Sequence, residues 1–268
     1  MALDIQRAEP EVGTSQPDAN GTGGLSLAER GKTAEGAPQS LDRRLFVQLH
    51  AYTGCPDPGP IAEEAARRGV GGVVYQSAQD PTGVAVVTFS EGDDFFVGDG
   101  RDFLTSDPFR ALTPRPEMTM FGRTYSIGYE KDLLGTLVAR PVKTMTNPAW
   151  PWAVWYPLRR GGRFEREPRE EQRRMLMEHG GIGRAFGAGD YAHDVRLACH
   201  GLDENDSDFI AGLVGKELFP LSAVVQRMRG TRHTAEFIER LGPFFVGRAV
   251  WQGAGPLAWA LDHEGSGH

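Results

Sequence analysis

Residues whose side chains could take part in a reaction or bind a metal are concentrated in one stretch, Trp152–Arg184. Tyr156 lies in a run of alternating apolar residues that is typical of a strand, and His179 ends a pattern that predicts a helix over Arg169–His179. Met175 and His179 are four residues apart, so a helix places both side chains on one face. The two glycines that follow the imidazole are expected to end this helix. A histidine held there beside an apolar face can act as an axial metal or haem ligand.

These side chains also have plainer interpretations. His179 could be an imidazole that is merely stabilised by the dipole at a helix C-terminus. Tyr156 could be a core aromatic residue, since strands favour aromatic side chains. Arg159 and Arg160 could belong to a solvated turn. The residues alone leave these alternatives open.

A second candidate group lies on the predicted strand Asp194–His200. Alternation places Asp194 and Arg196 on one face and Val195 and Leu197 on the other. A charged pair in a barrel interior would be costly unless it touched something polar. The pair is therefore a candidate for a distal or substrate-contacting role, and an intersubunit salt bridge is the alternative. The acidic run that follows, residues 203–208, lacks the spacing of a calcium loop and is expected to be a solvated turn.

Composition excludes several classes of protein. The chain has 268 residues, of which 40% are hydrophobic, and a net charge of −7. An acidic chain does not favour nucleic-acid binding, which needs a basic face. It has no apolar run of about 18 residues, so no membrane span is expected. Its two cysteines, Cys55 and Cys199, fit a reduced cytoplasmic protein. Arg43-Arg44 precedes a short apolar stretch that is better explained as a core strand than as an export signal.

The order of predicted elements repeats once along the chain. Residues 1–41 are poor in large apolar side chains and are expected to form a disordered tail. A strand–helix–strand–strand–helix–strand pattern fills residues 42–147, ending in a connecting segment that includes a helical part and an extended linker. The pattern recurs over 148–252, and residues 253–268 are expected to be a flexible C-terminal tail. Two βαββαβ units in one chain predict an α+β fold of two ferredoxin-like halves.

The second half carries a family resemblance. The runs YPLRR, PREEQRRMLMEHGGIGR, GLDENDSDF and PFFVG appear in this order. Together they resemble the motifs of the chlorite dismutase family, which includes the coproheme decarboxylases. The resemblance spans roughly residues 43–251. It implies a dimeric α+β barrel in each subunit, formed by the two repeats, and a homopentamer as the usual assembly.

The resemblance also implies a cofactor and roles for individual residues. The family binds an iron porphyrin, haem b or coproheme, and its proximal iron ligand corresponds to His179. The tyrosine that the decarboxylases oxidise with hydrogen peroxide corresponds to Tyr156, and Arg160 corresponds to the basic residue four positions later. Met175, Asp194 and Arg196 are further candidates for contact with the cofactor. A phenol near a strongly oxidising iron can lose an electron and a proton, and a nearby cation can hold a propionate.

Three positions depart from the family pattern. Asp194 stands where chlorite-decomposing members have a distal arginine and other members a glutamine, so chlorite dismutation is not expected. No histidine lies between Tyr129 and Trp155, where one branch of decarboxylases has its distal histidine. Arg232 stands where the family has the glutamate that accepts the proximal imidazole's N–H, which should change the redox tuning of the iron.

The sequence therefore predicts a haem-dependent oxidoreductase. Its most specific form is a cytoplasmic coproheme decarboxylase of haem biosynthesis that uses hydrogen peroxide. The alternatives are a haem peroxidase-like enzyme of unknown substrate, and a barrel protein with a haem-carrier or non-catalytic role.

Overall fold

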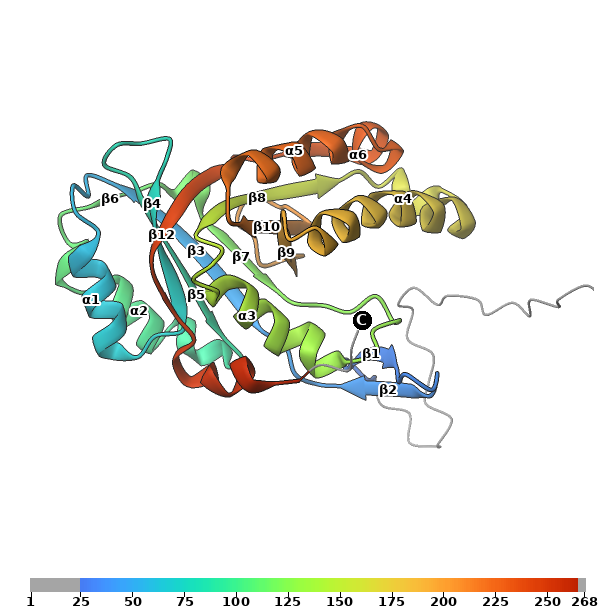
Figure 1. Cartoon of the computed structure of the whole chain (residues 1–268), viewed down its shortest axis with the longest axis horizontal. Coiled ribbons are helices and arrows are strands. Elements are labelled where there is room, and N and C mark those ends of the chain that lie inside the picture. The colour runs from blue at the N-terminus through green and yellow to red at the C-terminus, as the bar shows by residue number, and fades with distance from the viewer. Residues whose placement is uncertain (1–24, 265–268) are drawn as a thin grey trace, which may run out of the picture.

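The structure, a computed structural model, describes residues 25–264 and shows two repeats of strands and helices (Figure 1). The first repeat consists of β3 (Phe46–Thr53), α1 (Gly59–Arg68), β4 (Gly72–Ser77), β5 (Val84–Ser90), α2 (Asp99–Leu104) and β7 (Met120–Arg123). The second consists of β8 (Trp152–Arg160), α4 (Arg169–Ala188), β9 (His193–Ala198), β10 (Phe209–Gly215), α5 (Leu218–Arg229) and β12 (Phe245–Gly253). This order confirms the predicted α+β fold with ferredoxin-like repeats.

The strands of both repeats join into one antiparallel sheet that returns on itself. Its order is β10-β9-β7-β3-β5-β4-β12-β8-β11, and β10 also pairs with β8. The ring is uneven, because β7 and β9 meet at a single pair, Arg123 and Ala198, whereas β8 and β10 pair over seven positions. Two short strands, β6 (Thr113–Pro114) and β11 (Ile238–Leu241), extend its margins on β3 and β8 respectively.

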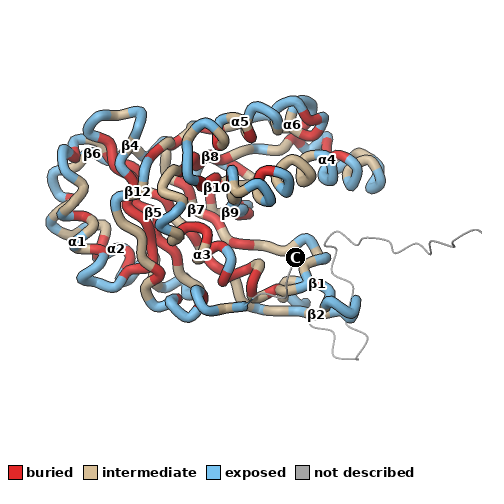
Figure 2. Tube along the Cα trace, in the orientation of Figure 1, coloured by how far each residue is buried: buried red, intermediate tan, exposed pale blue. Residues whose placement is uncertain are grey.

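Buried side chains form three large clusters, one inside the sheet and two outside it. The inner cluster joins alternate residues of most strands to a helical segment formed by η4 (Gly135–Ala139) and α3 (Arg140–Thr146). One outer cluster lies under α1 and α2, and the other lies between β8, β10, α4 and α5. Figures 1 and 2 show the two helix groups at opposite ends of the sheet with buried segments between them. The repeats are thus visible in the packing as well as in the element order.

Helix α4 is longer than predicted. It passes through Gly180 and Gly181 and ends at Ala188, although these glycines were expected to end it. Each glycine in a helix interior costs about 0.5–1 kcal/mol relative to alanine. Tertiary packing overrides that cost, because Met175 before the glycines and Phe186 after them are both buried. His179 therefore lies in the middle of a helix, and the dipole interpretation of its position is wrong.

The connection between the repeats is also more helical than predicted. Residues 141–147, expected to be an extended linker between two prolines, form most of α3. The helix continues without a break from the π-helical turn η4 into α3, and Pro141 lies just after that turn. Two short elements before β12, α6 (Arg232–Phe237) and β11, were not predicted at all.

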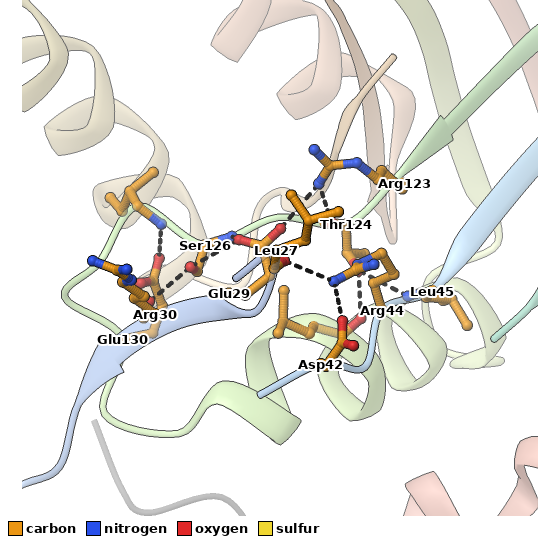
Figure 3. Close-up of polar contacts among 12 residues, drawn as sticks. Leu27, Glu29, Arg30, Asp42, Arg44, Leu45, Arg123, Thr124, Ser126 and Glu130 are labelled. Carbon is orange, nitrogen blue, oxygen red and sulfur yellow. Dashed lines mark hydrogen bonds and ion pairs between the residues drawn. The ribbon is translucent and has the colours of Figure 1, made fainter. Parts of the chain in front are cut away.

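Part of the predicted N-terminal tail is ordered. β1 (Glu29–Lys32) and β2 (Pro38–Leu41) pair with each other, and Figure 3 shows β1 tied to the end of β7 and the segment after it. The Glu29 carboxylate accepts hydrogen bonds from Arg123 (3.0 Å) and from the backbone and hydroxyl of Ser126 (2.9 and 3.0 Å). These contacts supply the stabilisation that the apolar content of residues 25–41 does not. Residues 1–24 lie outside the described residues.

The predicted C-terminal tail also contains an ordered part. A 3₁₀ segment, η6 (Gly255–Asp262), buries Leu257 and Ala260 against the inner cluster. Residues 265–268 lie outside the described residues.

Candidate functional site

The predicted site residues lie where α4 crosses the strands of the second repeat. Tyr156 on β8 and Arg196 on β9 both pair with Ala211 on the strand between them, β10. Directly paired residues of antiparallel strands point to the same face. Tyr156, Ala211 and Arg196 therefore form one row, and Ala211 and Tyr156 belong to the apolar cluster under α4 and α5.

Beyond β9, Tyr125 lies near this row. Arg123 pairs with Ala198, and Tyr125 lies two residues further on, past the end of β7, where Arg196 is close enough to affect its pKa. Burial raises the pKa of Tyr125, while the nearby guanidinium of Arg196 acts to lower it. Arg196 thus lies near both Tyr156 and Tyr125, and Tyr125 belongs to the last strand predicted for the first repeat, Met118–Ile127, of which the structure forms Met120–Arg123.

His179 faces this row from α4. Its side chain is half-buried, and burial lowers its pKa, with Arg196 acting in the same direction and Glu178 and Asp194 against it. A lowered pKa keeps the imidazole neutral near pH 7, as a metal ligand must be. The structure therefore brings His179, Asp194 and Arg196 together from two separate elements.

Asp194 and Arg196 form a salt bridge within one subunit, with a distance of 2.9 Å between Oδ2 and Nε. The side chains are 49% and 48% exposed, respectively. The pair lies on the outer face of the sheet towards α4, not in its interior, where Val195 and Leu197 lie. The partition of this strand between two faces was thus predicted correctly, but the assignment of the charged face to the interior was wrong.

Tyr156 is almost fully buried and stacks on Phe244, with 4.6 Å between ring centroids. Burial raises its pKa to about 12, with Arg229 and Asp194 as the nearest charged influences. The phenol consequently keeps its proton at neutral pH. Tyr156 is thus packed as a core aromatic residue, and it also lies on the same face of the sheet as Arg196.

Arg160 and Met175 lie at the end of the site nearest the start of α4. The Arg160 guanidinium lies over the rings of Phe164 (4.3 Å) and Phe209 (5.0 Å) and pairs with Glu165. Met175 packs with Phe164 in a small buried cluster. Arg160 is therefore held in one orientation by stacking and an ion pair, and Met175 anchors α4.

The segment from Thr231 to Thr234 faces the other side of His179. The Nδ1 atom of His179 lies 3.4 Å from the Thr231 hydroxyl oxygen and 3.5 Å from that of Thr234. The ring of His233 lies 5.2 Å from the ring of His179. Arg232 turns away and pairs with Glu171 and Glu236 at distances of 3.0 and 3.1 Å.

His233 is buried, with 7% of its surface exposed and no hydrogen-bond partner for either ring nitrogen among the described residues. Burial lowers its pKa to about 4, and His179 and Arg160 act in the same direction. Thr231, Thr234 and His233 were all missed by sequence reasoning, which examined this segment only for a carboxylate. The only sequence feature that could have indicated them is that they neighbour position 232, where a carboxylate was sought.

The surface of α4 beside His179 is nearly bare. A Cβ atom added at Gly180 or Gly181 would meet only the end of the Arg184 side chain, at 3.6 or 3.9 Å. At Gly183 it would meet only the terminal methyl of Met228, at 3.6 Å. A helix that keeps three glycines in one turn, despite their conformational cost, presents a flat surface next to an imidazole. Such a surface suits a planar ligand.

These features define an α+β protein of two ferredoxin-like repeats with an imidazole site in the second repeat. Residues 130–250 match the family model for chlorite dismutase. Over these residues, which are less than half of the chain, the protein is similar to the chlorite dismutase family, and the match supports its assignment to that family. No curated protein matches the chain.

Solved structures show the same fold at low sequence identity. A heme-binding protein from Thermus thermophilus is 17% identical with a TM-score of 0.58, covering 78% of this chain and 93% of its own. Chlorite dismutase from Candidatus Nitrospira defluvii, in complex with imidazole, is 13% identical with a TM-score of 0.59, covering 83% of this chain and 95% of its own.

Two absences hold for residues 25–264. None of the helices there has the length and apolar character needed to cross a bilayer. The same part of the chain contains no group of three or more His, Cys, Asp or Glu side chains suited to holding a bare metal ion.

Proposed function

We propose that this protein is a haem-dependent oxidoreductase in which His179 binds the iron of haem b or coproheme. The single observation that carries the proposal is the position of His179, a neutral, half-buried imidazole on a glycine-rich helix surface opposite the row of Tyr156 and Arg196. The match of residues 130–250 to the chlorite dismutase family model supports the same cofactor. A bound iron porphyrin would supply redox chemistry that protein side chains lack.

The specific reaction that we propose is the peroxide-dependent decarboxylation of coproheme in haem biosynthesis. Each step converts a propionic acid to a vinyl group, carbon dioxide and two hydrogen atoms, and hydrogen peroxide takes up those hydrogens and becomes two molecules of water. The oxidised side chain is Tyr156. Because its pKa is raised to about 12, Tyr156 is a neutral phenol that must lose its proton together with its electron.

The cations around the site would hold the propionates. Arg160 is fixed between two aromatic rings, and Arg196 is half-exposed beside Tyr125. A guanidinium binds a carboxylate through two parallel hydrogen bonds. Asp194 orients Arg196 and keeps it charged. As part of this proposal, the protein assembles as a homopentamer and acts in the cytoplasm.

One observation favours a second candidate, a haem peroxidase-like enzyme of unknown substrate. Arg196 is a partly exposed cation within electrostatic reach of His179. A fixed cation near the iron would stabilise the negative charge that develops when peroxide is cleaved, whatever reductant follows.

One experiment distinguishes the two candidate activities. The purified protein is titrated with iron coproporphyrin III, given hydrogen peroxide, and the porphyrin is analysed by mass spectrometry. Conversion of propionates to vinyls, lost in Tyr156→Phe while the porphyrin still binds, supports the decarboxylase. Binding without conversion, together with peroxide-dependent oxidation of a phenolic dye, identifies the peroxidase-like enzyme instead. A Soret band that persists unchanged in His179→Ala contradicts the role of His179.

A further inference from the structure

Helix α6 contacts α4 at the imidazole of His179. Thr231 is the N-cap residue of α6, and its side chain accepts a hydrogen bond from the backbone N–H of Thr234. The same hydroxyl oxygen is the atom 3.4 Å from Nδ1 of His179. Thr231 is 2% exposed, so water does not compete freely for this contact.

The Thr231 hydroxyl has one proton, and the carbonyl oxygen of Met228 accepts it. That contact is 2.7 Å long, whereas the next oxygen neighbour, the hydroxyl of Thr234, is at 3.3 Å. A hydroxyl whose proton is already donated offers only lone pairs. Because the Thr231 oxygen can then only accept, His179 is the donor in this contact, which places the imidazole proton on Nδ1 and leaves a lone pair on Nε2. The Thr234 hydroxyl, 3.5 Å from the same Nδ1, is the neighbouring group whose donation would favour the other tautomer.

We propose that Thr231 is the residue that holds His179 in the Nδ1–H tautomer and presents Nε2 to a metal. Thr231 acts as a positioning residue, since it reaches the metal only through the imidazole. A metal-bound histidine commonly donates its second N–H to a protein acceptor, which fixes the ring and its basicity. In this chain the acceptor is a hydroxyl, because Arg232 is turned towards Glu171 and Glu236.

A hydroxyl acceptor has a different consequence from a carboxylate acceptor. A carboxylate draws the Nδ1 proton strongly and gives the imidazole anionic character, which stabilises the oxidised metal. A hydroxyl leaves the imidazole neutral and a weaker donor. The chain is therefore built for a higher iron reduction potential than a carboxylate at position 231 would give, a consequence that rests on the proposed function, whereas the tautomer does not.

The tautomer is measured in the metal-free protein by ¹⁵N NMR of the imidazole nitrogens at pH 8, with His179→Gln to assign the signal. The expected result is the Nδ1–H form of His179 in the unmodified chain and in Thr231→Ser. Thr231→Val should shift the population towards Nε2–H. Thr234→Val, which removes the hydroxyl at 3.5 Å, is the matched control and should leave the tautomer unchanged. The Nε2–H form in the unmodified chain, or a shift caused by Thr234→Val alone, overturns the proposal.

A second measurement separates this role from capping α6. Thr231→Asp keeps an N-cap residue, so α6 should remain folded by circular dichroism. In the haem-loaded protein this variant should lower the iron reduction potential, and Thr231→Val should weaken haem affinity by about tenfold. An unchanged potential in Thr231→Asp assigns Thr231 to capping alone. Failure of the unmodified chain to bind haem would count against the proposed function but would leave the tautomer result standing.

Discussion

Tyr156 and Arg196 pair with the same residue, Ala211, from opposite sides of β10. The two side chains therefore stand two strands apart on one face, with the smallest chiral side chain between them. Strands lie about 4.8 Å apart, so the separation is roughly 10 Å. Only a methyl group therefore lies between a phenol and a guanidinium on the face towards α4.

The side chain at position 211 can be enlarged without placing new charge in the site. Ala211→Leu adds apolar volume where Ala211 is partly buried against the cluster under α4 and α5. We expect the variant to fold and to bind iron porphyrin at least tenfold more weakly, because its side chain occupies the space between Tyr156 and Arg196. Titration followed at the Soret band measures this loss. Unchanged affinity would show that the porphyrin does not lie over β10.

Arg196→Gln should weaken the binding of coproheme more than that of haem b. Coproheme carries more carboxylates, and the loss of one charge-assisted contact corresponds to about a tenfold change. The difference should diminish as salt is added, because the contact is half-exposed. Arg67→Gln is the matched control, since Arg67 pairs with Glu64 on α1, in the other repeat. Equal losses for the two porphyrins would remove the carboxylate-binding role of Arg196.

Tyr156 should make the protein sensitive to alkali. Its pKa is about 12 in the folded chain and near 10 when unfolded, because burial penalises the phenolate. Below pH 10 both states keep the proton and stability is unaffected. As the pH rises from 10 to 12 only the unfolded state releases it, so stability falls, by about 3 kcal/mol at most.

Comparing Tyr156→Phe with the unmodified chain isolates this effect from that of other buried tyrosines. Thermal unfolding is followed at intervals from pH 8 to 12. The melting temperature of the variant should fall less steeply above pH 10. Parallel curves would mean that the Tyr156 phenol is better solvated than its burial indicates.

The sequence was informative where a pattern depends on one element alone. Alternation predicted the strands of both repeats and placed Asp194 and Arg196 opposite Val195 and Leu197. It could not predict which strands would be neighbours, so the row through Ala211 emerged only from strand register. Register depends on the whole sheet and not on any local run of residues.

The errors have the same origin. The glycines after His179 are local signals for a helix end, but the burial of Met175 and Phe186 on either side outweighs them. The acceptor of the His179 N–H was sought among charged residues at position 232. In the structure the Arg232 side chain points outward and the Thr231 hydroxyl points inward. Both orientations follow from the formation of α6, which has no strong sequence pattern.

Substituting the glycines of α4 tests how much their conformational cost weakens the helix. Gly180→Ala and Gly181→Ala should each stabilise the metal-free protein by about 0.5–1 kcal/mol, because alanine loses less backbone entropy in a helix. The added methyl groups meet only the flexible end of Arg184. Denaturant unfolding of the metal-free protein measures the change. Gly69→Ala is the contrasting control and should destabilise, since Gly69 ends α1 with a φ of 65°. Destabilisation by either α4 substitution would mean that the helix surface is more closely packed than the structure shows.

The hydrogen bonds of Glu29 give a final test, of the N-terminal strands. Its carboxylate accepts three hydrogen bonds from Arg123 and Ser126, the residues on either side of the Thr124-Tyr125 pair. Glu29→Ala leaves the Ser126 amide without its acceptor, which should cost about 1–3 kcal/mol and increase hydrogen exchange at Ser126 and its neighbours. Glu35→Ala, in the exposed turn between β1 and β2, should change neither quantity. Because Tyr125 lies near Arg196, a loosened segment should also weaken porphyrin binding in Glu29→Ala. If exchange increases but binding does not change, the β1–β2 pair stabilises the fold without supporting the site.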